Sequence, residues 1–180
     1  MSGFSMEIFG VIVVAGIVVS ILISVCRNHS MDAANDEYRN AAWTADQAIR
    51  RANAALKDLA DVVQTPDAKN RIPEIRAKRA AYLTGRNEAI EMISATENAR
   101  EEAYHTQRRG VRTQNLFLGG ADDLSALSLY RRQNELAAIS ISERLIDPSA
   151  ILEKANLLIH YQEMKREIMK EMEHTGRITA

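Results

Sequence analysis

The sequence from Ile8 to Cys26 reads IFGVIVVAGIVVSILISVC and contains neither a charge nor a proline. As an α-helix, a stretch of this length spans roughly 28 Å, because each residue rises about 1.5 Å. The hydrocarbon core of a bilayer is about 30 Å thick. We therefore expect residues 1–27 to form a single transmembrane anchor and residues 28–180 to form a separate helical domain.

Two neighbouring features bear on this anchor. No basic residue precedes the apolar stretch, which is also longer than the apolar region of a typical signal peptide, so cleavage is not expected. Cys26 is the only cysteine of the chain, and this excludes an intrachain disulfide. It has no evident base beside it, so we do not expect a catalytic thiol.

Small residues repeat at every fourth position of the apolar stretch, at Gly16, Ser20 and Ser24. Inside a membrane, such a face allows two helices to approach closely. We therefore expect these three residues to pack membrane helices together in a homo-oligomer.

Basic residues predict how the anchor is oriented. They follow the apolar stretch, beginning with Arg27 and Arg39, and none precedes it. Basic residues near a transmembrane helix favour the cytoplasmic side. The sequence thus predicts that the N-terminus lies outside and that the C-terminal domain is cytoplasmic.

The stretch from Gly3 to Val19, GFSMEIFGVIVVAGIVV, resembles the N-terminus of type IV pilins. In that family, cleavage after a glycine leaves an aromatic residue and a nearby glutamate at the head of a long apolar helix. This sequence departs from the pattern, since Ser2 replaces the usual basic residue and Glu7 lies one position early, counted from Phe4. The resemblance implies a strand-rich head, which the remaining sequence does not resemble.

Apolar residues recur at helical spacing through most of residues 28–180, whereas the alternation typical of strands is almost absent. Prolines and one glycine-containing loop, NLFLGGADD (residues 115–123), divide this region. The sequence predicts four helices at about 31–64, 73–114, 124–146 and 148–174. The expected buried stripes are Tyr38, Ala42, Ile49, Ala52, Leu56, Leu59 and Val63 in the first helix, and Ile75, Tyr82, Ile90, Ile93, Ala99 and Ala103 in the second.

Short connections favour antiparallel neighbours, so we predict an all-α fold in which the anchor precedes an antiparallel, coiled-coil-like bundle. The first two helices are longer than the last two, which suggests that a second subunit covers them. Residues 27–180 contain all 23 basic residues and, because Glu7 precedes them, 23 of the 24 acidic residues. Such balance gives no long-range field for nucleic acid, so no nucleic-acid partner is expected.

Two Glu-x-x-His pairs are the sharpest candidates for chemistry: Glu102 with His105 and Glu171 with His174. Di-iron bundles use this spacing, with further glutamates on two other helices. Glu102 and His105 are surrounded by charge, however, and His174 lies at a helix end. We therefore predict no catalytic, cofactor or metal site and no enzyme, and a di-iron carboxylate enzyme is kept as a remote alternative.

Two groups of residues are candidates for interaction. Arg108, Arg109 and Arg112 form a basic cluster that could meet phosphate or lipid headgroups, or could pair with Asp122 and Asp123 at the start of the third helix. Leu116, Phe117 and Leu118 are apolar residues in the predicted loop, where they could plug the bundle end or bind a partner.

The residues Asn40, Ala41, Ala42 and Trp43, followed by Arg50 and Arg51, resemble the LemA family. Its members share an N-terminal anchor and a helical domain with a tryptophan soon after the membrane. This sequence departs from the family in lacking the proline-containing stretch after the arginine pair. The resemblance implies a membrane-tethered adaptor or accessory protein that binds another protein.

From the residues themselves we expect a structural role. The predicted function is a membrane-anchored, self-associating scaffold subunit of a larger envelope-associated or virion assembly. Its expected partners are the lipid bilayer, further copies of the chain and other proteins of that assembly. No cofactor and no small-molecule substrate are indicated.

Overall fold

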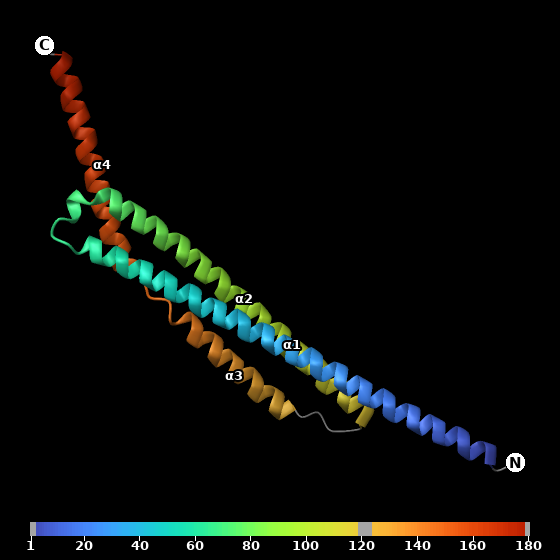
Figure 1. The fold of residues 1–180 in the computed structure, drawn as a ribbon. Helices are drawn as coiled ribbons and strands as arrows, with labels where there is room; N and C mark the ends of the chain where they lie inside the picture. Colours follow the sequence, from blue (N-terminus) through green and yellow to red (C-terminus); the bar gives the residue numbers. More distant parts are fainter. Residues whose placement is uncertain (1–2, 119–123, 179–180) are drawn as a thin grey trace. The chain divides into compact units, whose positions relative to one another are not determined.

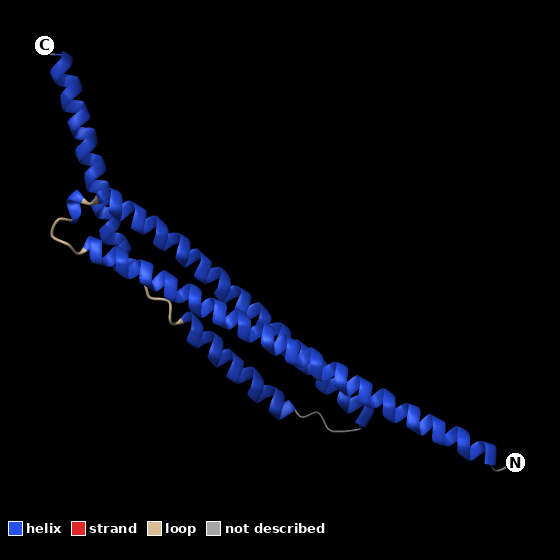
Figure 2. Ribbon diagram, viewed as in Figure 1, coloured by secondary structure: helices blue, strands red, loops and turns tan. Residues whose placement is uncertain are grey.

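The computed structural model describes the backbone of residues 3–118 and 124–178, and the side chains of residues 15–112 and 128–175 apart from positions 130, 134 and 138. Every element in these ranges is helical (Figures 1 and 2), which confirms the all-α prediction for the described chain. The elements are α1 (Gly3–Val63), the short 3-10 helix η1 (Ala68–Asn70), α2 (Ile72–Leu118), α3 (Leu124–Ser142) and α4 (Ser149–Ile178).

The described residues contradict the predicted transmembrane anchor. Within them, no helix carries an apolar stretch long enough to cross a membrane. The earlier part of the predicted segment, residues 8–14, lies outside the described side chains. The single-pass assignment, the membrane location and the cytoplasmic orientation are corrected accordingly.

The segment predicted as an anchor and the helix predicted at 31–64 belong to one helix, a continuation that the sequence leaves open because no proline or glycine separates them. α1 runs without a break from Gly3 to Val63, because neither proline nor glycine occurs after Gly16. The boundary expected at residues 27 and 28 therefore lies inside a continuous helix. The predicted helix at 31–64 is the second half of α1.

The ends of α2 and α3 also differ from the prediction. α2 continues to Leu118, so Leu116, Phe117 and Leu118 belong to its last turn and not to a loop. No proline interrupts this part of the chain, and the helix can therefore extend up to the glycine pair. α3 ends at Ser142, earlier than expected.

The chain divides into two compact units, each built from segments that are distant in sequence. Unit 1 contains residues 1–43 and 94–139, and unit 2 contains residues 44–93 and 140–180. The long helices α1 and α2 contribute to both units.

Unit 2 contains the main hydrophobic core. The end of α1 and the start of α2 pack there with η1 and with the first turns of α4. Fully burying a Leu, Ile or Val side chain contributes about 1.5–3 kcal/mol, so this cluster dominates the stability of unit 2. Its buried members are Leu59, Val62, Val63, Ala68, Ile72, Ile75 and Ala155.

Buried residues repeat at every seventh position along α2, which is the spacing of a coiled-coil seam. The side chains become smaller along this repeat, from Ile75 and Tyr82 in unit 2 to Ala103 and Gly110 in unit 1. Small residues on α2 allow α1 to approach closely: a Cβ atom added to Gly85, three residues after Tyr82, would stand 3.7 Å from the Cα atom of Ala52. The repeat comprises Ile75, Tyr82, Ala89, Thr96, Ala103 and Gly110.

The connection between α3 and α4 is fixed to α1 by one side-chain amide. Asn53 Nδ2 donates to the carbonyl oxygen of Arg144 at 2.8 Å, and Asn53 Oδ1 accepts from the backbone N–H of Ile146 at 3.1 Å. At the start of α4, the Asp147 carboxylate accepts from the Ser149 hydroxyl at 2.5 Å and from the Ser149 N–H at 3.1 Å. These two bonds lower the pKa of Asp147. The early end of α3 follows, because the backbone of this connection binds Asn53 instead of continuing the helix.

Asp46 supports the same connection through charge. Its Oδ1 atom lies 2.9 Å from Arg144 Nη1, and its Oδ2 atom lies 2.8 Å from Arg50 Nε. The hydrogen bond from Arg144, followed by that from Arg50, lowers the pKa of Asp46 from its ordinary value of 3.8. Ionised Asp46 therefore stabilises the fold above pH 3.8, and this contribution is lost as the pH falls through the lower pKa of the folded state.

We expect replacement of Asp46 by asparagine to destabilise the protein at pH 7 and to have a smaller effect at an acidic pH below the lowered pKa of Asp46, where protonation weakens the native pair as well. Urea unfolding of both proteins at the two pH values measures this difference. Asp36→Asn is the control, because Asp36 is exposed and its distance to Arg39 is 3.6 Å. An equal destabilisation by Asp46→Asn at both pH values would contradict the assigned role of the carboxylate.

Candidate functional site

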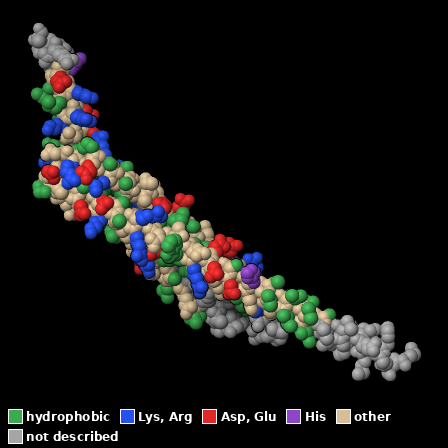
Figure 3. Space-filling model, in the orientation of Figure 1, with side chains coloured by type: hydrophobic (Ala, Val, Ile, Leu, Met, Phe, Trp, Pro, Cys, Tyr) green, Lys and Arg blue, Asp and Glu red, His purple; other side chains and the backbone are tan. Residues whose placement is uncertain are grey.

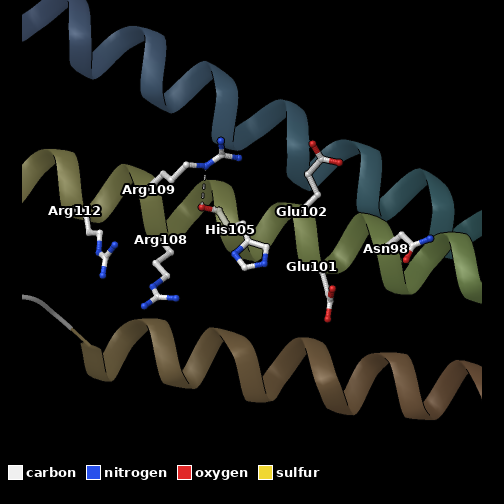
Figure 4. Close-up of a pocket in the computed structure, with 7 residues that line it drawn as sticks. All are labelled: Asn98, Glu101, Glu102, His105, Arg108, Arg109 and Arg112. Atoms are coloured by element: carbon white, nitrogen blue, oxygen red, sulfur yellow. Dashed lines mark hydrogen bonds between the residues drawn. The ribbon is translucent and has the colours of Figure 1, made fainter.

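A groove in unit 1 runs along consecutive turns of α2 and has a volume of about 620 Å³. In Figure 4, His105, Arg108 and Arg112 point toward α3, whereas Glu102 and Arg109 point toward α1. The lining residues recur at intervals of three and four because they follow successive helical turns. They are Asn98, Glu101, Glu102, His105, Arg108, Arg109 and Arg112, and we call this feature the basic groove.

A smaller hollow of about 250 Å³ adjoins the basic groove between α2 and α3. Arg131 of α3 lies with its guanidinium carbon 5.6 Å from the ring centre of Tyr104, a cation–π contact. The Nε atom of Arg131 also lies 2.9 Å from Glu135 Oε1. The hollow is lined by Arg100, Glu101, Tyr104, His105, Arg108, Arg131 and Glu135.

Several cations of this region have no carboxylate partner. Within the described part of the chain, neither Arg108 nor Arg112 forms an ion pair. The buried Nε atom of Arg100 likewise has no hydrogen-bond partner there. Arg109 is different, since its Nε atom donates to the carbonyl oxygen of His105 at 3.4 Å. The groove therefore offers guanidinium groups, those of Arg108 and Arg112, that can still donate hydrogen bonds to an anionic ligand.

The structure describes the side chains of one of the two predicted interaction groups. Arg108, Arg109 and Arg112 lie together in the basic groove. The side chains of Leu116, Phe117 and Leu118 lie outside the described residues. Tyr104 and Arg131 were missed by sequence reasoning, because only the packing of α3 beside α2 brings them to the same site.

The two Glu-x-x-His pairs belong to different units. Glu102 and His105 lie in unit 1 and line the basic groove, whereas Glu171 and His174 lie in unit 2. Among the residues that the structure describes, no group of three or more His, Cys, Asp or Glu side chains could hold a metal ion. The described residues therefore provide no set of ligands for the two iron ions of the di-iron alternative.

Among the residues that the structure describes, the small-residue face of α1 is exposed. A Cβ atom added to Gly16 would find nothing within 4 Å, and the Ser20 hydroxyl donates back to the Gly16 carbonyl oxygen at 2.9 Å. Ser24 is exposed. The large apolar residues around this face are also exposed, each by 49–60%: Ile17, Val18, Val19, Ile21, Leu22 and Val25.

α4 carries a second exposed apolar surface, in unit 2. Glu163 pairs with Arg76 of α2 at 2.6 Å, and from there to Thr175 every side chain of α4 is exposed. Figure 3 shows apolar side chains among charged ones along this helix. The apolar positions recur at intervals of four and three residues, and we call them the α4 stripe: Leu157, Tyr161, Met164, Ile168 and Met172.

Comparison with known proteins identifies no relative: no protein-family model, no curated protein and no solved structure matches this chain. The resemblances to type IV pilins and to the LemA family therefore gain no support from this comparison. The structure itself gives the fold class: the described residues are all helical, and in unit 2 the end of α1 and the start of α2 pack around a hydrophobic core.

Proposed function

We propose that this protein is a self-associating structural subunit, in which the α4 stripe packs against the α4 stripe of a second copy. The observation that carries this proposal is the exposure of the stripe. Its members are exposed by 44–66% in the single chain, although their spacing is that of a buried seam.

The helical state of this part of α4 supports the need for a partner. Isolated helices shorter than about 12–15 residues are only marginally stable in water, and most helical stability comes from packing an apolar face. Residues 163–175 of α4 are helical, yet all of them are exposed. Packing the stripe against another helix would supply the missing tertiary contacts.

A second copy fits the charges of α4. Lys165 and Glu171 lie beside the stripe on its two sides, so each such helix carries both signs next to its apolar residues. The whole chain has a net charge of only −1, and copies therefore repel each other little. The exposed apolar residues of α1 give each chain a further surface for assembly, which suits a structural subunit.

The experiment is light scattering of the full chain over a range of concentrations, with Ile168→Asp as the test variant. Ile168 is 56% exposed at the middle of the stripe, so an aspartate there places a charge in the seam without disturbing the core of unit 2. We expect an oligomer for the unaltered chain and a smaller mass for Ile168→Asp.

Lys170→Gln is the matched control, because it changes the net charge by the same amount on the opposite side of α4 and should leave the mass unchanged. Circular dichroism checks that each variant is folded. A monomer at every concentration, or equal masses for the unaltered chain and Ile168→Asp, would contradict the proposal. So would a chain that is monomeric alone and becomes ordered only on phospholipid vesicles.

A further inference from the structure

We propose that the basic groove of unit 1 binds a small molecule through its phosphate groups. This inference is independent of the proposed self-association, since the groove and the α4 stripe lie in different units. It rests on the side chains that enter the groove, on their charge balance and on the size of the adjoining hollow.

The donors converge from successive turns of one helix. Arg108 and Arg112 are four residues apart on α2, which places their Cβ atoms about 5–6 Å from each other. Both point toward α3 in Figure 4, as does His105. Two arginines four residues apart on one helix can bind the oxygens of a single phosphate or of two linked phosphates, because the planar fork of arginine matches phosphate geometry.

The charge balance favours an anion beside Arg108 and Arg112. Of the carboxylates that line the groove and the hollow, Glu135 already pairs with Arg131. Glu102 points toward α1 (Figure 4), which leaves Glu101 as the carboxylate facing the unpaired cations. Against it stand Arg100, Arg108 and Arg112, so the excess charge is positive.

The dimensions favour a small ligand over a polymer. The hollow between α2 and α3 has a volume of about 250 Å³, and Tyr104 and Arg131 form part of its wall. The chain as a whole is nearly neutral, so it does not offer the extended positive surface that nucleic acid requires. A phosphate or diphosphate group fits both the local charge and the space.

The test is isothermal titration calorimetry of the full chain with inorganic pyrophosphate at about 0.15 M ionic strength, where weak long-range attraction is screened. We expect saturable binding to the unaltered chain. Arg108→Gln and Arg112→Gln should each weaken it about tenfold or more, because each removes a charge-assisted hydrogen-bond donor. Adenosine diphosphate and orthophosphate in parallel titrations distinguish a nucleotide from a free phosphate as the source of the group.

Arg39→Gln is the charge-matched control. Arg39 also lies in unit 1, but it pairs with Asp36 on α1 outside the groove. Binding to this variant should equal binding to the unaltered chain, and circular dichroism confirms that all variants are folded. The absence of saturable binding to the unaltered chain with any of the three anions, or an equal loss for Arg39→Gln and Arg108→Gln, would overturn the proposal.

Discussion

Replacing Leu59 by alanine is expected to lower the free energy of unfolding by about 2–5 kcal/mol. Leu59 is fully buried in the core of unit 2, where α1, α2 and α4 meet. Shortening its side chain removes apolar contacts and leaves a cavity that the three packed helices cannot close fully. Urea unfolding followed by circular dichroism at 222 nm measures the change.

Leu136→Ala is the control for this substitution. Leu136 is 68% exposed, and its truncation should change the free energy of unfolding by no more than about 0.5 kcal/mol. The two leucines thus separate burial from the chemical change itself. Similar effects at both positions would show that the cluster around Leu59 is not the core of the protein.

Replacing Asn53 by alanine is expected to destabilise the protein by about 0.5–1.5 kcal/mol, because the two hydrogen bonds it removes are exposed to solvent. The amide of Asn53 binds the carbonyl oxygen of Arg144 and the N–H of Ile146, so alanine leaves both backbone groups without this partner. The connection between α3 and α4 should also become more mobile. Urea unfolding measures the loss of stability, and amide hydrogen exchange at Ile146 measures the loss of protection.

Asn53→Asp distinguishes the two hydrogen bonds. The aspartate keeps an acceptor for the N–H of Ile146 but has no donor for the carbonyl oxygen of Arg144. We expect faster exchange at Ile146 in Asn53→Ala than in Asn53→Asp. Exchange at Ile146 that is unchanged in Asn53→Ala would refute the role of this amide.

The helices of this chain could be predicted from sequence because their apolar residues recur with helical spacing and prolines mark several of their ends. The seam of α2 was harder to predict. Ile90 was expected in the buried stripe, yet it is 43% exposed, whereas the small residue Ala89 beside it is buried. Small seam residues such as Ala89 and Gly110 carry little hydrophobic signal, so periodicity alone favours the larger neighbour.

The contacts between distant segments could not be predicted from the sequence. Asn53 binds backbone groups of Arg144 and Ile146 across more than ninety residues, and no local pattern announces such a pair. The same holds for the candidate site. Arg108 and Arg112 were recognised as a cluster on one helix, but the contact of Arg131 with Tyr104 depends on how α3 packs beside α2.

The two corrected elements have separate causes. The helix end was predicted too early because the paired glycines drew the whole stretch from residue 115 into one loop, although the residues before them continue α2. The anchor was predicted from apolar length alone. The described residues contain no stretch that meets this requirement.

The most direct test of the central claim is a cysteine cross-link at the middle of the α4 stripe, in the full chain with Cys26→Ser. Met164 is central to the stripe, so two paired stripes bring the two Met164 positions close in either a parallel or an antiparallel arrangement. We predict that Met164→Cys forms a covalent dimer on mild oxidation, whereas Lys170→Cys on the opposite side of α4 does not. A monomeric Met164→Cys product, or equal cross-linking at both positions, would contradict the pairing of α4 stripes.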